Sequence, residues 1–175
     1  AALAPVCAGA CPAPLRAGIT HWPPFDMPSP DGATGINPAV LRAVADRLDC
    51  EVTFHKRPWG RLLDELRDGD LDVTGAAHRT ADRRAYARFS KRYMPYTAAL
   101  FVDSTENGGY AGLREFLARG KSLAVIRGYT YGGQIDDMLA QPAYNGQVFR
   151  MYSADESVRA VTHDRVAGLL GNPKV

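Results

Sequence analysis

The stretch INPAVLRAVADRLDCEVTFH, residues 36–55, decides the fold class, because a helical pattern leads directly into a strand pattern. Asn37 and Pro38 suit the N-cap and the first turn of a helix. Four apolar residues then recur at helical spacing and predict one buried face: Val40, Leu41, Val44 and Leu48. Residues 52–55 follow as a short apolar strand. A helix that leads into a strand in this way is part of a βαβ unit, which indicates a parallel sheet.

The first strand of that unit precedes the helix. Residues 15–19 form an apolar run that we expect to be this strand. Between it and the helix, prolines and glycines predict an exposed loop: Pro23, Pro24, Pro28, Pro30, Gly32 and Gly35.

The same alternation continues to residue 170. Further helices are expected near residues 62–66, 81–88, 113–119, 135–139 and 154–161, and further strands at 71–77, 96–102, 123–126, 148–152 and 166–170. Gly120 ends one of these helices, and Ser153 with Glu156 forms a capping box that opens the last one. The polar residues 103–109 indicate a boundary between two regions.

Composition excludes several classes of protein. Hydrophobic residues make up 46% and charged residues 23% of the 175 residues, as in a globular domain. The formal net charge of +2 gives no support for nucleic-acid binding. No run approaches the roughly 20 apolar residues that span a bilayer. Residues 1–14 are uncharged and rich in Ala and Pro, which is typical of a mature N-terminus after signal-peptide cleavage.

The three cysteines predict one disulfide bond. Cys11 and Cys50 each stand just before an apolar run, so they would lie at the same ends of neighbouring parallel strands. This placement suits a Cys11–Cys50 bridge and leaves Cys7 over. The alternative is three free thiols in a reducing compartment. The spacing of Cys7 and Cys11 is a poor metal signal, because a structural zinc site takes about four ligands, and no metal is expected.

Local motifs occur in a particular order along residues 15–172. The stretches LRAG (15–18) and WPPF (22–25) form an opening strand and an aromatic-Pro-Pro-Phe loop, and residues 32–40 form the entry to a helix. Residues 58–72 combine an aromatic, leucines, a glycine and an aspartate, and TADRRAYARFSKRY (80–93) contains Thr-x-x-Arg and Phe-Ser-x-x-Tyr. GYTY (128–131) and residues 165–172 follow. Together these motifs resemble the type II periplasmic solute-binding proteins of amino-acid ABC importers, bacterial extracellular solute-binding protein family 3.

This resemblance implies an α/β fold of the type II periplasmic-binding-protein class, with two lobes that each contain a mainly parallel sheet flanked by helices. We expect an N-terminal extension over residues 1–14, lobe 1 over 15–102 and lobe 2 over 103–175. In the family the chain then returns to lobe 1, so this C-terminal part of the fold is expected to be missing. The resemblance also implies a monomeric periplasmic receptor that closes on a small polar or carboxylate-bearing solute and delivers it to a membrane ABC permease.

The resemblance further implies the site residues. Arg83 matches the arginine that grips a ligand carboxylate, a contact that suits the planar guanidinium. Arg84 is the rival, because the alignment can slide by one residue. Thr130 lies at a glycine-led turn, where a hydroxyl and backbone amides can bind an anion. The remaining candidates are expected to line the ligand cleft: Trp22, Phe25, Trp59, Ala76, His78, Tyr129 and Asn172.

Each candidate also has a structural interpretation. An arginine can be solvated on a helix, a threonine can cap one, and aromatic residues can pack a core or anchor a loop. His78, which stands where the family carries hydroxyl residues, is a hydrogen-bonding wall of the cleft or a satisfied structural histidine.

Two departures from the family pattern bear on the ligand. Asn172 stands where amino-acid binders carry an aspartate for the ligand's ammonium group, and no acid occupies the matching place after Gly18. A buried ammonium needs a compensating anion. The expected ligand is therefore a carboxylate or another polar molecule without an α-ammonium group.

No catalytic motif is present, so no catalytic residue and no cofactor are expected. Five aspartates are interpreted as solvated or turn acids: Asp68, Asp70, Asp72, Asp136 and Asp137. Two alternatives stay open. One is a periplasmic lyase on the same scaffold, similar to cyclohexadienyl dehydratase, and the other is the sensory input module of a receptor.

Overall fold

The computed structural model describes residues 11, 13–30, 32–105 and 109–174. These residues divide into two units. Unit 1 contains the described residues up to Arg57 together with Arg61–Phe89, and unit 2 contains Pro58–Gly60 and the described residues from Ser90 onward. Cys7 and most of the expected N-terminal extension lie outside the described residues.

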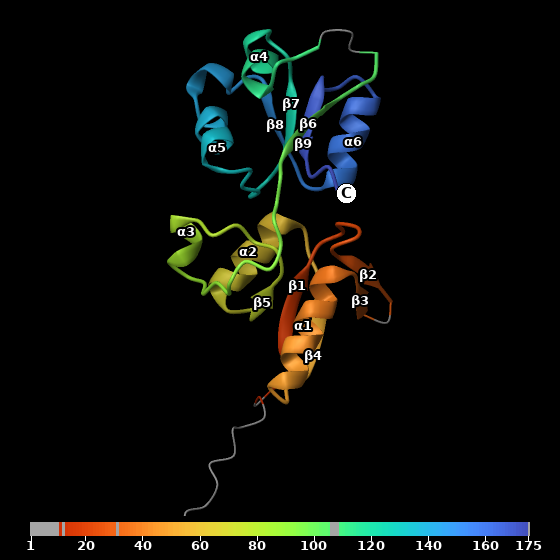
Figure 1. Ribbon diagram of the computed structural model, residues 1–175, viewed down its shortest axis with the longest axis vertical. Coiled ribbons are helices and arrows are strands. Elements are labelled where there is room, and N and C mark those ends of the chain that lie inside the picture. Colours follow the sequence, from red (N-terminus) through yellow and green to blue (C-terminus); the bar gives the residue numbers. More distant parts are fainter. Residues whose placement is uncertain (1–10, 12, 31, 106–108, 175) are drawn as a thin grey trace, which may run out of the picture. The chain divides into compact units, whose positions relative to one another are not determined.

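Unit 1 is built on a parallel sheet of three strands in the order β4-β1-β5. The strands are β1 (Leu15–Ile19), β4 (Val52–Lys56) and β5 (Val73–Thr74), and Ala17 of β1 is in register with Phe54 on one side and Val73 on the other. α1 (Ile36–Arg47) connects β1 to β4, and α2 (Trp59–Asp68) connects β4 to β5 (Figure 1). The predicted βαβ arrangement is therefore confirmed.

Packing on the two faces of β1 explains why this strand is central. Ala17 and Ile19 are almost fully buried. Gly18 points to the other face, where a Cβ atom would lie 2.7 Å from side-chain atoms of both Leu62 and Leu71. Glycine at this position therefore lets α2 approach the sheet closely.

The segment before α1 is not simply an exposed loop. It contains a cis Pro23–Pro24 peptide bond and a two-stranded antiparallel hairpin of β2 (Met27–Ser29) and β3 (Gly32–Thr34). Pro28 and Pro30 concealed this hairpin, because proline is usual in loops and is tolerated only at strand edges.

The start of α1 also differs from the prediction. Its N-cap is Gly35, and Asn37 is the second helical residue, fully buried. The amides of Ile36 and Asn37 donate to the carbonyls of Pro24 and Phe25, so the preceding loop caps the helix. Gly35 has a φ of 110°, and a Cβ there would lie 2.6 Å from the Phe25 oxygen. Only glycine fits this turn without strain.

The buried face of α1 was predicted wrongly. Asn37, Pro38 and Ala45 are its buried residues, whereas Val40, Val44 and Leu48 are exposed. The capping contacts fix the rotation of the helix about its axis, and this rotation turns the Asn37 side inward.

Unit 2 contains a four-stranded sheet in the order β6-β9-β7-β8. The strands are β6 (Ala99–Val102), β7 (Leu123–Ile126), β8 (Val148–Met151) and β9 (Gly168–Gly171). β7 is parallel to β8 and β9, and β6 is antiparallel to β9. Since β6 belongs to this sheet and the units divide between Phe89 and Ser90, the boundary expected near residue 103 lies too late in the chain.

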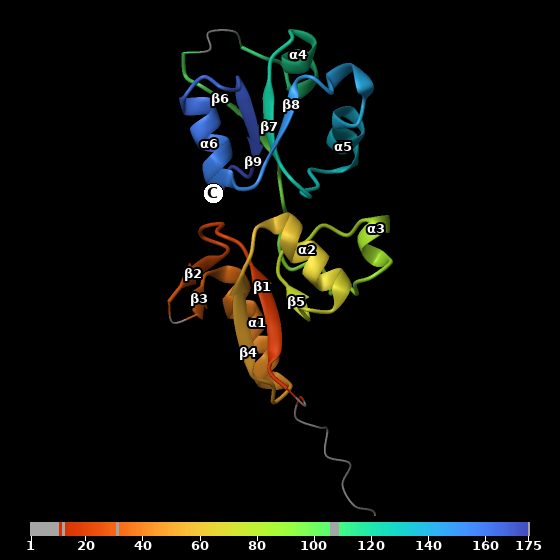
Figure 2. The same ribbon diagram turned by 180° about the vertical axis from the view of Figure 1, so that it is seen from behind.

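Helices cover both faces of this second sheet. α4 (Leu113–Ala118) and α5 (Gly133–Leu139) lie on one face, and α6 (Ala154–Thr162) lies on the other (Figures 1 and 2). Phe116, Leu117 and Leu139 pack with Leu123 and Leu170 on the first face, and Ala160 packs with Ala124 on the second. A short 3₁₀ helix (Pro142–Tyr144) precedes β8.

The ends of several elements lie inside the predicted ranges. β5 occupies two residues of the expected strand at 71–77, and α3 (Ala81–Arg84) is only half of the expected helix at 81–88. The Ser153 hydroxyl accepts from the Glu156 amide as predicted, but the Glu156 carboxylate accepts from Tyr152 rather than Ser153.

The predicted disulfide bond is present between Cys11 and Cys50. It joins the residues before β1 to the residues before β4, and these two strands are neighbours. The bridge therefore ties the N-terminal segment to the edge of the unit 1 sheet.

Candidate functional site

Arg83 is the third residue of the four-residue helix α3. Thr80 is the N-cap of α3, and its hydroxyl accepts a hydrogen bond of 3.2 Å from the Arg83 amide. The Arg83 Nη1 donates to the His78 carbonyl at 2.8 Å, and the residue is only 5% exposed. Arg84, the rival candidate, is exposed. The Thr80 cap and the His78 carbonyl therefore position Arg83.

Ala76 and His78 belong to the loop before α3. The His78 carbonyl of this loop accepts the hydrogen bond from Arg83. The loop begins at Gly75, where a Cβ would lie 2.6 Å from the Asn37 Cβ, so the loop passes tightly over the start of α1. Ala76 has a φ of 51°, which is unusual for a residue other than glycine. Ala76 and His78 are both half-buried. The loop therefore runs from Gly75, which lies against Asn37, to His78, which accepts the hydrogen bond from Arg83.

Asp26 is a buried acid in this unit that the sequence analysis missed. It is 6% exposed, and burial raises its pKa to about 6, although hydrogen bonds with Asn37 and Thr20 lower it in part. Within the described part of the chain, its Oδ1 has no hydrogen-bond partner. A single acid in a proline-rich segment forms no sequence pattern that would predict burial. The burial of Asp26 is evident only in the structure, where Asn37 lies beside it.

Trp22 and Phe25 pack on each other. Their ring centroids are 4.3 Å apart, and both residues are buried. Trp22 also closes a backbone bridge with Asp26, and the Phe25 carbonyl caps α1. These contacts anchor the loop that contains the pair.

The aromatic candidates of unit 2 form a second group. The Trp59 indole Nε1 donates to the Gly128 carbonyl at 3.0 Å, and its ring meets Tyr129 edge-on at 5.6 Å. Tyr129 lies 6.1 Å from Tyr131, whose hydroxyl accepts from the Ile126 amide. Burial raises the pKa of Tyr131. Trp59, which starts α2, thus fixes the turn at residues 128–131.

Thr130 lies in this turn, but the turn does not open a helix directly. α5 begins at Gly133, and the Asp136 carboxylate accepts hydrogen bonds from the Tyr131 and Gly132 amides at 2.9 and 3.2 Å. These two amides are therefore already occupied by an anion from the chain itself. The Thr130 amide and hydroxyl have no partner among the described residues, so the anion site expected here is reduced to Thr130 itself.

Asn172 is 7% exposed and lies directly after β9. Its Oδ1 accepts from the Lys174 amide at 2.9 Å. The side chain is thus fixed at the end of the strand, and it carries no charge to offer a ligand.

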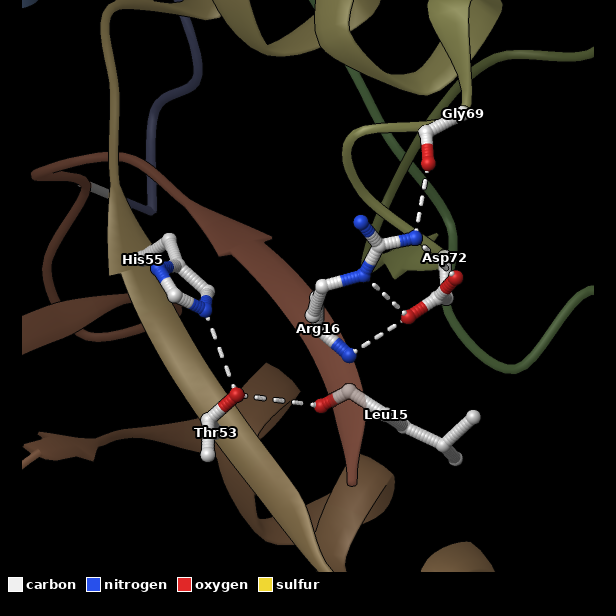
Figure 3. A network of polar contacts seen from close by, with 6 residues as sticks. All are labelled: Leu15, Arg16, Thr53, His55, Gly69 and Asp72. Atoms are coloured by element: carbon white, nitrogen blue, oxygen red, sulfur yellow. Dashed lines mark hydrogen bonds and ion pairs between the residues drawn. The ribbon is translucent and has the colours of Figure 1, made fainter. Parts of the chain in front are cut away.

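Asp72 is an exposed acid, as expected, and it pairs with Arg16. Its carboxylate accepts from the Arg16 amide at 2.8 Å and from the Arg16 guanidinium at 2.8 and 3.0 Å, and the same guanidinium donates to the Gly69 carbonyl (Figure 3). The hydrogen bonds from Arg16 lower the pKa of Asp72 to about 2. On the neighbouring strand, Thr53 contacts His55 and the Leu15 carbonyl. This network fastens β1 to its neighbours and does not bring acids together for catalysis.

Among the described residues, no His, Cys, Asp and Glu side chains gather in threes or more as metal ligands would. None of the helices in this part of the chain has the length and apolar character needed to cross a membrane.

The model of the bacterial extracellular solute-binding proteins, family 3, matches residues 15–163. The arginine-binding periplasmic protein of Mannheimia haemolytica is 24% identical over 157 residues, which cover 88% of this chain and 60% of that protein. This chain therefore spans about 60% of the length of that relative.

Two solved structures share the fold. An ancestral arginine-binding protein bound to arginine has a TM-score of 0.77 and 24% identity, and the match covers 91% of this chain and 70% of that one. An ancestral amino-acid-binding protein, described as a precursor of cyclohexadienyl dehydratase, has a TM-score of 0.76 and 20% identity, with 92% and 71% covered.

Proposed function

The chain belongs to the bacterial extracellular solute-binding proteins, family 3, and we propose that it is a periplasmic receptor for a small carboxylate-bearing solute, which it delivers to a membrane ABC permease. The observation that carries this proposal is Arg83, a buried arginine whose guanidinium is oriented by the His78 carbonyl. A buried, fixed guanidinium is suited to a carboxylate, because its planar fork matches the two carboxylate oxygens.

The chemistry of the other candidates narrows the class of ligand. Asn172 is neutral and fixed by Lys174, so it offers no anion for an ammonium group. Asp26 is an acid, but hydrogen bonds with Asn37 and Thr20 already engage it. A carboxylate that lacks an α-ammonium group therefore fits the candidate residues better than the corresponding amino acid.

Matched pairs of compounds test this preference. Thermal unfolding is measured with L-arginine against δ-guanidinovalerate and with L-glutamate against glutarate, since each pair differs only in the α-ammonium group. A bound ligand raises stability by mass action, by about 2.7 kcal/mol at a hundredfold excess over Kd. We expect a carboxylate without the ammonium group to raise the melting temperature more than its amino-acid partner. A consistent preference for the amino acids would overturn the proposed ligand class.

A separate incubation tests the lyase alternative. Prephenate and arogenate, cyclic carboxylates of the kind a cyclohexadienyl dehydratase would act on, are incubated with the protein and followed by absorbance. A receptor leaves them unchanged, and turnover above the rate without protein would contradict the receptor assignment.

A further inference from the structure

The near-neutral total charge conceals one strongly basic segment, residues 79–92. It carries Arg79, Arg83, Arg84, Arg88, Lys91 and Arg92, with Asp82 as its only acid. Because the whole chain has a net charge of +2, the remaining residues are net negative. The charge is therefore concentrated in one short part of the sequence.

The structure does not use most of these cations internally. Arg83 is buried, but the other five are exposed: Arg79, Arg84, Arg88, Lys91 and Arg92. None of these five forms an ion pair with a residue that the structure describes. Asp82 pairs with Arg67, which lies outside the segment.

Three other arginines of unit 1 form ion pairs. Arg16 is paired with Asp72, and Arg57 and Arg61 both pair with the buried Glu65. These pairs fasten strands and helices to one another. The five cations of the basic segment have no comparable role in holding the fold, although unpaired like charges repel one another.

The segment has little regular secondary structure, so it suits a broad charged surface better than a protein partner of defined shape. Beyond the four-residue helix α3, residues 85–98 contain no helix or strand. Tyr93, directly after the segment, has an exposed side chain. A protein interface of ordinary size needs a buried apolar centre. An anionic lipid surface needs only several basic side chains within reach, and interfacial tyrosines add to the binding.

We propose that the continuous stretch of residues 79–92, which runs from unit 1 into unit 2, binds the anionic phospholipid headgroups of a membrane surface through Arg79, Arg84, Arg88, Lys91 and Arg92. Each basic side chain near such a surface strengthens binding roughly fivefold, and the effect weakens as salt screens the charges. Arg83 is buried and is not one of the contacting residues, so this inference holds or fails independently of the solute that the protein binds.

Vesicle co-sedimentation tests the proposal. The protein is mixed with phosphatidylcholine vesicles containing about one-third phosphatidylglycerol, and with pure phosphatidylcholine vesicles, in about 0.05 M and about 0.5 M salt. We expect binding to the anionic vesicles at low salt only. Absence of that binding, or equal binding to the neutral vesicles, would overturn the proposal.

Two triple variants locate the surface. Arg88→Glu/Lys91→Glu/Arg92→Glu is expected to weaken binding to the anionic vesicles by at least about 100-fold. Arg114→Glu/Arg150→Glu/Arg165→Glu makes the same change in net charge at exposed, unpaired arginines of unit 2, and it is expected to keep most of the binding. Equal losses in both variants would mean that total charge, not this segment, attracts the protein.

A third variant guards against a folding defect. Arg88→Gln/Lys91→Gln/Arg92→Gln removes the charges without reversing them, and circular dichroism confirms the fold of all three. A folded glutamine variant that binds the anionic vesicles as tightly as the unmodified protein would contradict the proposal. Binding to soluble polyaspartate but not to the vesicles would also contradict it and would indicate an acidic protein partner instead.

Discussion

Asp72 accepts hydrogen bonds from both the backbone amide and the guanidinium of Arg16, so one carboxylate fastens the central strand β1 to the residue that leads into β5. Asp72 N also donates to the Arg16 carbonyl. β5 itself is only two residues long. The Arg16–Asp72 pair therefore adds hydrogen bonds between β1 and the residue just before β5.

This pair predicts a small, acid-sensitive contribution to stability. Asp72→Asn is expected to lower the free energy of unfolding at neutral pH by about 0.5–1 kcal/mol, since both partners are partly exposed. The pKa of Asp72 is lowered to about 2, so its contribution is present above the unfolded value near 3.8 and is lost as pH falls through about 2. Urea unfolding across this range should show the two proteins converging. Asp70→Asn, an exposed acid nearby, is the control and should change little.

The pH dependence of stability predicted for Asp26 is the opposite of that predicted for Asp72. Burial raises the pKa of Asp26 to about 6, so the stability it contributes is complete below the unfolded value near 3.8 and is lost as pH rises through 6. Asp26→Asn removes this loss and is expected to stabilise the protein by about 1–3 kcal/mol near pH 8, with little effect near pH 4. Urea unfolding at both pH values measures the difference. A variant as pH-dependent as the unmodified protein would show that Asp26 is not the titrating group.

The disulfide bond contributes through the loop that it closes. Cys11 and Cys50 are 39 residues apart, and chain-entropy arguments give about 4 kcal/mol for a loop of this length. Cys50→Ser should therefore lower the free energy of unfolding by about 2–4 kcal/mol. Cys7→Ser removes a thiol but keeps the bridge, and urea unfolding should find it unchanged. Equal losses in both variants would exclude a specific role for the Cys11–Cys50 bond.

The strands were the most predictable part of the fold, because a short buried strand leaves an apolar run whatever surrounds it. β1 and β7 occupy the predicted residues. The buried face of α1 was not predictable in this way, since Val40, Val44 and Leu48 share a face of the helix just as Asn37 and Ala45 do. Contacts of Pro24 and Phe25 with the helix N-terminus decide which face turns inward.

The candidate site residues were likewise only partly predictable from the sequence. The motif around residue 80 indicated an arginine, but two adjacent arginines satisfy it equally well. The Thr80 cap and the His78 carbonyl distinguish them, because these contacts bury Arg83 and leave Arg84 exposed. Likewise, no sequence pattern indicates that Asp136 occupies the amides next to Thr130.

Calorimetric titration of Arg83 variants tests the central claim most directly. δ-Guanidinovalerate, glutarate and L-arginine are titrated into the unmodified protein, Arg83→Ala, Arg83→Lys and Arg84→Ala, with circular dichroism to confirm folding. We predict that at least one carboxylate binds the unmodified protein and that Arg83→Ala loses about 2–4 kcal/mol, roughly 30- to 1,000-fold in Kd. Arg83→Lys should recover only part of this loss, because it keeps the charge but not the fork, and Arg84→Ala should bind normally. Unchanged affinity in folded Arg83→Ala, or a loss confined to Arg84→Ala, would contradict the account.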